Sequence, residues 1–233
     1  MIKDLGPSEK ERFYHYLTNF ISENKAGKFA IIIRDRTRHL TIVMEDLFQQ
    51  HNTSAVLRSC DCFGIQDVHV IENFNKYEVN PAVALGSSKW INIYRYNKQE
   101  DNSADCFNKL KAQGYRIIAA TPHKEGFTPE SLPLENKIAL VFGTEYDGLS
   151  ATALTMADGF VGIPMYGFTE SFNISVSAAL LLRALIERLH NSAIDWQLSD
   201  EEKLDVQIQW AKNVIKRADL LEQDFWEKLK NKL

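Results

Sequence analysis

Three stretches of the sequence place glycine or short polar side chains directly after a run of apolar residues. They are residues 45–64, 142–148 and 163–177. In proteins that alternate strands and helices, such bends lie at the carboxyl edge of the sheet, where free backbone N–H groups can bind a ligand. These stretches are therefore the candidate functional segments, and we expect the second and third to lie side by side.

Two residues in these stretches, Asn52 and Glu145, can each be interpreted in two ways. Asn52 could act on a substrate, but it could equally cap the N-terminus of the following helix, from whose second turn Arg58 would project. Glu145 is either a substrate contact or a carboxylate that braces its own loop, and the residue type alone favours bracing. The residues by themselves leave both pairs of alternatives open.

Common nucleotide and metal signatures are missing from the sequence. The glycines of the second stretch are not followed by Lys-Ser/Thr, so it is not a phosphate-binding P-loop, and no G-x-G-x-x-G follows an expected strand. No cysteines and histidines have zinc spacing, and we expect no metal. Cys60 and Cys62 should point to different faces of a helix. We interpret the three cysteines as buried, reduced thiols.

Composition is that of an ordinary globular protein. The chain has 233 residues, of which 45% are hydrophobic and 25% charged, enough for one substantial core with short terminal additions. No apolar run approaches the roughly 18 residues of a membrane span, and the first residues lack a signal peptide. We therefore expect a cytoplasmic protein with no membrane partner.

Attraction to nucleic acid would have to be local, because the net charge is −4. The densest basic cluster is formed by Arg34, Arg36 and Arg38, with Lys25 and Lys28 just upstream. A solvated helix face explains such a run equally well.

The elements that must position these residues alternate from Leu40 onward, which is typical of a parallel sheet with crossover helices. The pattern predicts strands at 40–44, 68–71, 91–94, 115–120, 138–142 and 160–163, and helices at 54–63, 104–113, 151–156 and 174–189. Capping boxes at residues 8–11 and 199–202 predict amphipathic helices near both ends. We therefore predict a helical extension at 1–39, a central domain at 40–190 and a second helical extension at 191–233.

Read together, the three stretches resemble the three motifs of the SpoU/TrmH family of RNA ribose 2′-O-methyltransferases, within the SPOUT superfamily. The motifs match residues 52–64, 140–150 and 163–177 in the family's order and spacing. Asn-Ile-Ser-Val-Ser at 173–177 is the most specific piece. Phe172 stands where the family usually has leucine. The change is conservative, so Phe172 should still line a cofactor pocket.

The resemblance implies a mostly parallel α/β sheet with helices on both faces. It also implies a C-terminal part threaded as a trefoil knot, an exception to the general absence of knots. It further implies S-adenosylmethionine bound in the knot, and a homodimer with each site near the subunit interface. By motif position, the S-adenosylmethionine contacts fall on Thr121, Gly143, Ile163 and Phe172. The family's catalytic and substrate-binding positions fall on Arg58, Asn52, Glu145, Ser171 and Asn173.

The implied reaction makes demands on these residues. A ribose 2′-hydroxyl must attack a methylsulfonium in line, so the site has to orient both and make the oxygen more nucleophilic. The resemblance assigns this activation to Arg58, yet a guanidinium stays protonated and is a poor general base. Our hypothesis is that Arg58 binds the adjacent phosphate and stabilises the developing alkoxide, while the proton leaves to phosphate or water. Asn52 and Asn173 would fix the ribose and the loops, and Ser171 would hold substrate or cofactor.

Within the family, the chain looks most like the group that methylates guanosine 18 in the tRNA D-loop. The similarity rests on Arg38 followed by a Leu-Thr strand and then Glu45, together with the run at residues 85–90. Candidate phosphate contacts are Arg34, Arg36, Arg38 and Arg188.

Three alternative functions remain, one within the same family and two outside its catalytic class. A family member acting on ribosomal RNA would share the same motifs. A non-catalytic knotted RNA-binding protein would not be expected to keep all five implied catalytic positions. A generic nucleotide-binding α/β enzyme is disfavoured by the missing phosphate loops.

Overall fold

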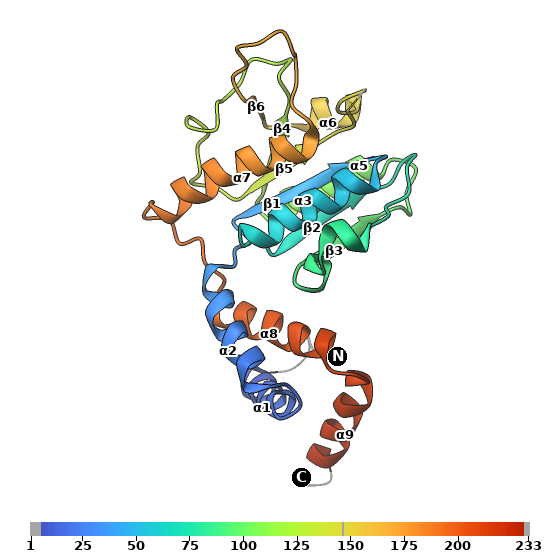
Figure 1. The fold of residues 1–233 in the computed structure, drawn as a ribbon, viewed down its shortest axis with the longest axis vertical. Coiled ribbons are helices and arrows are strands. Elements are labelled where there is room, and N and C mark those ends of the chain that lie inside the picture. Colours follow the sequence, from blue (N-terminus) through green and yellow to red (C-terminus); the bar gives the residue numbers. More distant parts are fainter. Residues whose placement is uncertain (1–5, 146, 231–233) are drawn as a thin grey trace. The chain divides into compact units, whose positions relative to one another are not determined.

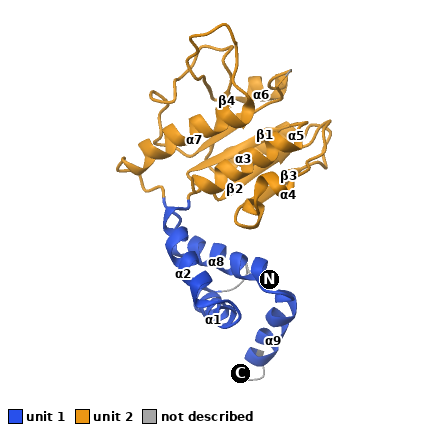
Figure 2. Cartoon of the chain, in the orientation of Figure 1, with its two compact units in different colours: residues 1–36, 197–233 blue, residues 37–196 orange. Residues whose placement is uncertain are grey.

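The computed structural model describes residues 6–145 and 147–230, which belong to two compact units (Figure 2). Residues 37–196 form one unit, called here the sheet unit. Residues 1–36 and 197–233 form the other, called here the helical unit, so the two ends of the chain fold together.

Six parallel strands form one sheet in the order β3-β2-β1-β5-β4-β6 (Figure 1). The strands are β1 (Leu40–Glu45), β2 (Asp67–Ile71), β3 (Asn92–Tyr96), β4 (Arg116–Ala120), β5 (Ile138–Phe142) and β6 (Gly159–Val161). Met44 pairs with Phe142, so β1 and β5 end together. The carboxyl ends of the strands that precede the first two candidate stretches therefore meet at one edge.

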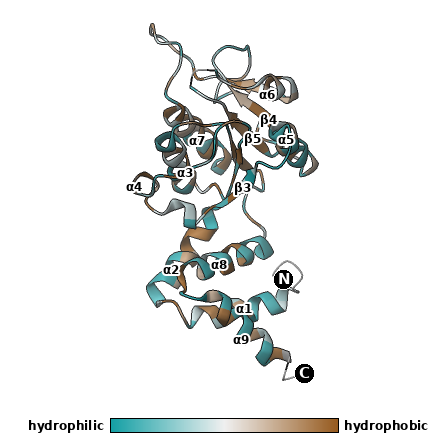
Figure 3. Ribbon diagram, turned by 90° about the vertical axis from the view of Figure 1, so that its right-hand side faces the viewer, coloured by the Kyte–Doolittle hydropathy of each residue, from teal (hydrophilic) through white to brown (hydrophobic). Residues whose placement is uncertain are grey.

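Helices cover both faces of the sheet. On one face α3 (Gln50–Cys62) and α7 (Ile174–His190) lie side by side (Figure 1). On the other lie α5 (Asn102–Ala112) and α6 (Ala151–Met156). Strands β4 and β5 are largely apolar on both sides and appear brown in Figure 3. Because side chains alternate along a strand, Leu140 and Phe142 pack with α3 and α7, while Ala139 and Val141 pack with α5. The predicted α/β class with a parallel sheet is confirmed.

Helix starts were the main error of the sequence prediction. Helix α3 begins at Gln50, upstream of the predicted residue 54. The first helix, α1 (Pro7–Thr18), begins before the predicted box at residues 8–11, which is therefore wrong. Proline suits the first helical position, and the Glu9 carboxylate accepts from the N–H of Gly6 at 3.0 Å. The box at residues 199–202 is confirmed.

The helical unit is held by aromatic side chains and one buried amine. It contains α1, α2 (Glu23–Ile32), η2 (Ile33–Asp35), α8 (Asp200–Val214) and α9 (Ala218–Lys230). Phe13 packs against Phe225 and Trp226. Lys10 is only 2% exposed, and its ammonium pairs with Glu201 at 2.8 Å. These contacts join the first and last segments of the chain.

Among the described residues, none of the helices has the length and hydropathy of a membrane span. Cys60 and Cys106 are buried, but Cys62 is exposed, so the expectation that all three thiols are buried is wrong. Cys62 lies two residues after Cys60 and therefore on another face of α3.

Stability should fall with acid because of one histidine on β2. Burial lowers the pKa of His69 to about 4. In the unfolded chain a histidine titrates near 6.5, so the unfolded state binds the extra proton between pH 6.5 and 4. As pH drops through this window, His69 should remove up to about 3 kcal/mol from the free energy of unfolding. In the His69→Gln variant, the free energy of unfolding, measured by urea denaturation, should fall less steeply as the pH drops through this window. In His51→Gln, at an exposed histidine, the free energy of unfolding should fall as steeply with pH as in the unchanged protein.

Candidate functional site

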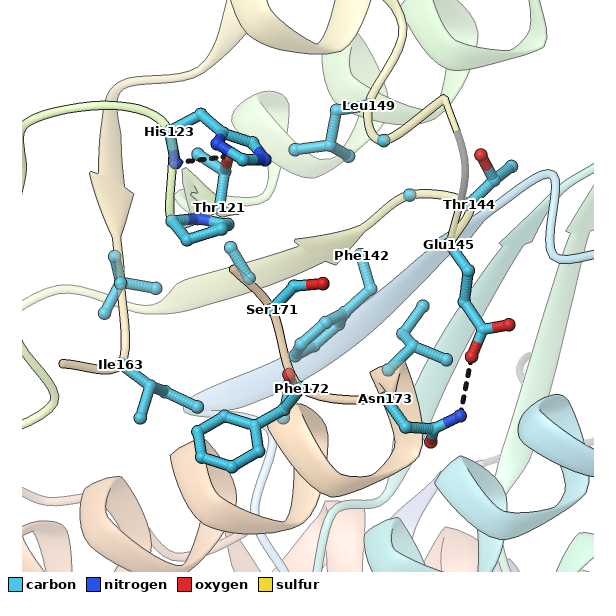
Figure 4. Close-up of a pocket in the computed structure, with 18 of the residues that line it drawn as sticks. Thr121, His123, Phe142, Thr144, Glu145, Leu149, Ile163, Ser171, Phe172 and Asn173 are labelled. Carbon is cyan, nitrogen blue, oxygen red and sulfur yellow. Dashed lines mark hydrogen bonds between the residues drawn. The ribbon is translucent and has the colours of Figure 1, made fainter. Parts of the chain in front are cut away.

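A cavity of about 440 Å³ lies at the carboxyl ends of β4, β5 and β6 and at the start of α7 (Figure 4). It is called here the first cavity. The four predicted cofactor contacts, Thr121, Gly143, Ile163 and Phe172, all line it. So do three of the predicted catalytic residues, Glu145, Ser171 and Asn173. The structure therefore brings the second and third candidate stretches together around one space.

Gly143 makes the tight bend in the cavity wall. The N–H of Thr144 donates to the carbonyl of Gly148 at 2.8 Å, which folds the loop back on itself. A Cβ on Gly143 would lie 2.1 Å from that same carbonyl oxygen, a distance no real Cβ tolerates. Only glycine allows this close approach of backbone to backbone.

Asn52, Glu145 and Asn173 form a hydrogen-bonded group, called here the amide–carboxylate cluster. Glu145 Oε1 accepts from Asn52 Nδ2 at 2.9 Å and from Asn173 Nδ2 at 2.6 Å (Figure 4 shows the second bond). Asn173 Nδ2 also donates to Asn52 Oδ1 at 3.1 Å. One residue from each of the three candidate stretches thus meets at a single carboxylate.

The cluster decides between the alternative roles of Asn52 and Glu145 that the sequence left open. Asn52 is not a helix cap, because α3 already begins at Gln50. Asn173 is one, since its Oδ1 accepts from the N–H of Ser175 at 2.9 Å at the start of α7. Glu145 does brace its loop, as its residue type suggested. Because Glu145 is also exposed in the cavity wall, bracing does not prevent contact with a substrate.

Two predicted catalytic residues lie differently. Ser171 is exposed and lines the first cavity. Arg58 is exposed on α3 and does not line the first cavity. The structure therefore does not place Arg58 at the first cavity of its own chain.

The four predicted phosphate contacts belong to two different units, Arg34 and Arg36 to the helical unit and Arg38 and Arg188 to the sheet unit. Arg34 is exposed in the helical unit. Arg36 is 2% exposed, with its guanidinium 5.2 Å from the centre of the Trp210 ring. A side chain this buried packs inside the unit and cannot bind a surface phosphate, so the prediction for Arg36 is not kept.

Arg38 and Arg188 are held by neighbours in the sheet unit. Arg38 Nε pairs with the Asp67 carboxylate at 2.8 Å. Arg188 Nη1 donates to the carbonyl of Pro129 at 2.6 Å. These bonds hold each guanidinium against its own unit, whereas Arg34 is exposed.

Sequence reasoning missed the role of Glu45, at the end of β1. Its carboxylate is 2% exposed and accepts from both the N–H and the hydroxyl of Ser150, at 2.9 and 2.7 Å, and from the hydroxyl of Ser103. Ser150 is also the N-cap of α6, where its Oγ accepts from the N–H of Ala153. Glu45 therefore ties the loop after β5 to β1. A carboxylate as the last residue of an apolar strand was the only signal in the sequence.

A second cavity, of about 240 Å³, was also not foreseen. It is lined by Leu47, Phe48, Gln49, Asn52, Asn75, Thr144, Glu145, Asp147 and Ile174. Asp147 lies in the wall of both cavities. Within the described ranges, 6–145 and 147–230, no group of three or more His, Cys, Asp or Glu side chains is placed to hold a metal ion.

The fold and the site together define an α/β protein whose ligand cavity is built from loops at the carboxyl edge of a parallel sheet. Residues 39–183 match the model of the SpoU rRNA Methylase family. The chain is 42% identical to a tRNA (guanosine(18)-2′-O)-methyltransferase of Borreliella burgdorferi, over 88% of this chain and 93% of the relative. It is 30% identical to the enzyme of that name from Thermus thermophilus, over 78% and 92%.

Solved structures agree with this result. The TrmH/SpoU tRNA modifying enzyme of A. aeolicus superposes with a TM-score of 0.73 at 27% identity, over 83% of this chain and 98% of that one. The SpoU methyltransferase AviRb of Streptomyces viridochromogenes, in complex with AdoMet, shares the fold with a TM-score of 0.58 at 20% identity, over 69% and 64%. This chain belongs to the SpoU methylase family.

The role of Glu45 can be tested by removing its charge. In Glu45→Gln one carboxylate oxygen becomes an NH2 group, which cannot accept from the hydroxyls or the N–H of its partners. Loss of a buried hydrogen bond to a charged acceptor should lower the free energy of unfolding by about 1.5–3 kcal/mol, measured by urea denaturation. The matched change Glu100→Gln, at an exposed carboxylate, should stay within about 0.5 kcal/mol. Equal effects of the two changes would contradict a bracing role for Glu45.

Proposed function

We propose that this protein transfers a methyl group from S-adenosylmethionine to the ribose 2′-hydroxyl of guanosine 18 in the D-loop of tRNA. The observation that carries the proposal is the convergence of the three family motifs on Glu145 at the wall of the first cavity. The names of the relatives that match most of the chain support the choice of RNA and nucleotide.

The first cavity suits S-adenosylmethionine by size and by chemistry. Its volume of about 440 Å³ is within the range of small-molecule sites, about 300–1,000 Å³. Ile163, Phe172 and Leu149 supply apolar surface, and Gly143 lets the loop after β5 fold back on its own backbone to form part of the wall. Thr121, Gly143, Ile163 and Phe172 would hold the cofactor. When bound, S-adenosylmethionine supplies the methyl group as an activated sulfonium.

The residues of this chain would orient the ribose and stabilise charge on its oxygen. The amide–carboxylate cluster fixes the first turn of α3, the loop after β5 and the start of α7 relative to one another, which preorganises the site. Ser171 offers a hydroxyl to substrate or cofactor. Arg58 would bind the adjacent phosphate and stabilise the developing alkoxide, with the proton leaving to phosphate or water.

We further propose a homodimer and a trefoil knot, as the family resemblance implied. Val176 and Leu180 lie one turn apart on α7 and are each 43% exposed, close in sequence to the 44% exposed Phe172. An apolar strip beside a cavity favours association with a second copy, whose exposed Arg58 would then reach this site. The knot is supported by the loop after β4, which hydrogen-bonds across to the segment that leaves β6: Gly162 N–H donates to the Phe127 carbonyl at 2.9 Å.

The remaining assignments are also part of the proposal. Residues 40–190 would carry the activity, and the extensions at 1–39 and 191–233 would add RNA contacts, with Arg34 as one of them. The protein would act in the cytoplasm, where tRNA is modified. Ribosomal RNA is the second candidate substrate, because the family model is described as that of rRNA methylases.

Binding of the cofactor can be tested at Gly143. In Gly143→Ala the added Cβ would collide with the Gly148 carbonyl, so the loop has to open. Affinity for S-adenosylmethionine, measured by calorimetry, should drop at least about tenfold, a change of about 1.4 kcal/mol. Gly167→Ala, where a Cβ meets nothing within 4 Å, is the matched control and should bind as before. Unchanged affinity in Gly143→Ala would place the cofactor elsewhere.

The reaction can be tested with labelled S-adenosylmethionine and separate pools of tRNA and ribosomal RNA. Label should enter tRNA and map to the ribose of guanosine 18. Label in ribosomal RNA alone would favour the second candidate, and no transfer to either pool would favour a non-catalytic RNA-binding protein.

Arg58→Lys keeps the charge but loses the two-pronged donor, so turnover should decrease about 10²-fold or more. Near-normal turnover in that variant would contradict the role given to Arg58.

A further inference from the structure

The second cavity has no part in the function proposed so far. It adjoins the first, because Thr144, Glu145, Asp147 and Ile174 line both. Asn52, a member of the amide–carboxylate cluster, also lines it. A ribose bound at the cluster would therefore border both the methyl donor's cavity and the second cavity.

We propose that the second cavity binds the guanine base of the nucleotide to be methylated, with Phe48 stacking on the base and Asp147 reading its Watson–Crick edge. The proposal rests on the proposed function and adds to it the residues that select the base. A base and its ribose are covalently joined, so a base site has to lie within one nucleotide of the reacting hydroxyl, as this cavity does.

Phe48 supplies an aromatic surface that packing inside the chain does not explain. Its side chain is 78% exposed, although it follows directly on β1 and a short turn. Exposed aromatic side chains at the wall of a small cavity are the usual platforms for unpaired RNA bases. A platform of this kind is insensitive to the identity of the base, so selection has to come from another residue.

Asp147 is placed to make that selection. Its backbone N–H donates to Thr144 Oγ1 at 3.0 Å, which anchors the residue in the turn, while its side chain is exposed. A carboxylate in an RNA site repels phosphate, so it contributes only if a base donates hydrogen bonds to it. Guanine alone among the four bases presents two adjacent donors, N1–H and the 2-amino group, on its Watson–Crick edge. A carboxylate accepts both at once.

Asn75, in the wall of the second cavity, is held in place by Asp46. One oxygen of its carboxylate accepts from the backbone N–H groups of Asn73, Phe74 and Asn75, at 2.8, 2.8 and 3.1 Å. Asn75 Nδ2 in turn donates to the Asp46 carbonyl at 2.8 Å. Asn75, which lines the cavity, is thereby fixed before any ligand enters, as a selective site requires.

The test uses two tRNA substrates that differ only at position 18, one with guanosine and one with inosine, which lacks the 2-amino group. We would measure kcat/KM for both at saturating S-adenosylmethionine. The unchanged protein should prefer guanosine by about tenfold or more, because a hydrogen bond to a charged acceptor is lost with inosine. Asp147→Asn should lose at least about tenfold on guanosine and should prefer guanosine by less than about twofold. The ratio is taken within one variant, so a partly folded preparation does not change it.

Phe48→Ala and Glu100→Gln complete the design. Phe48→Ala should lower kcat/KM about 5- to 100-fold for both substrates alike and keep the preference for guanosine. Glu100→Gln removes an exposed carboxylate that lines neither cavity and should behave as the unchanged protein. Calorimetry with S-adenosylmethionine shows whether Asp147→Asn also disturbs the first cavity.

The outcomes separate the two proposals. Methylation of guanosine 18 with no preference over inosine, or an Asp147→Asn variant that keeps the preference, would overturn the base site and leave the proposed function standing. An unchanged protein that methylates neither tRNA would overturn the proposed function and the base site with it.

Discussion

The carboxylate of Glu145 is the meeting point on which the site depends. It accepts from the amides of Asn52 and Asn173, which come from helices about a hundred and about thirty residues away along the chain. Both bonds end on the same carboxylate oxygen, and the negative charge of that acceptor strengthens each of them. The two asparagines also bond each other, so the three residues close a small ring of hydrogen bonds. The ring therefore fixes the first turn of α3, the loop after β5 and the start of α7 relative to one another.

The order of the strands makes this meeting possible. Because β5 lies between β1 and β4, and β6 lies beyond β4, the loops that follow these strands are neighbours at one edge. Parallel strands put all their carboxyl ends on that edge, which is why α/β proteins bind ligands there. Two further contacts sharpen the local geometry. Glu45 ties the end of β1 to the start of α6, and the glycine at 143 lets the loop after β5 fold against its own backbone.

The two units differ in where their charged side chains lie and in what those side chains contact. In the helical unit, Lys10 and Arg36 are buried against acidic and aromatic partners, so part of the basic character near the N-terminus stabilises the unit itself. In the sheet unit, the carboxylates at the carboxyl edge include buried ones, Glu45 and Asp46, and exposed ones, Glu145 and Asp147. Burial with several donors makes a structural brace, while exposure in a cavity wall leaves acceptor oxygens for a ligand. Position relative to solvent therefore separates roles that the residue type does not.

The sequence by itself determined the class of the fold, the strands, and the segments of the site, because alternating apolar runs and glycine stops act locally. Strand β5 and helix α6 have the bounds that the pattern predicted. Only the tertiary structure decided what depends on distant partners. Asn52 proved to be a cluster member and not a cap, Arg36 proved to be buried, and Glu45 and the second cavity were not foreseen. A side chain's burial and its hydrogen-bond partners depend on residues that are far away in the chain. A local sequence pattern therefore cannot predict them.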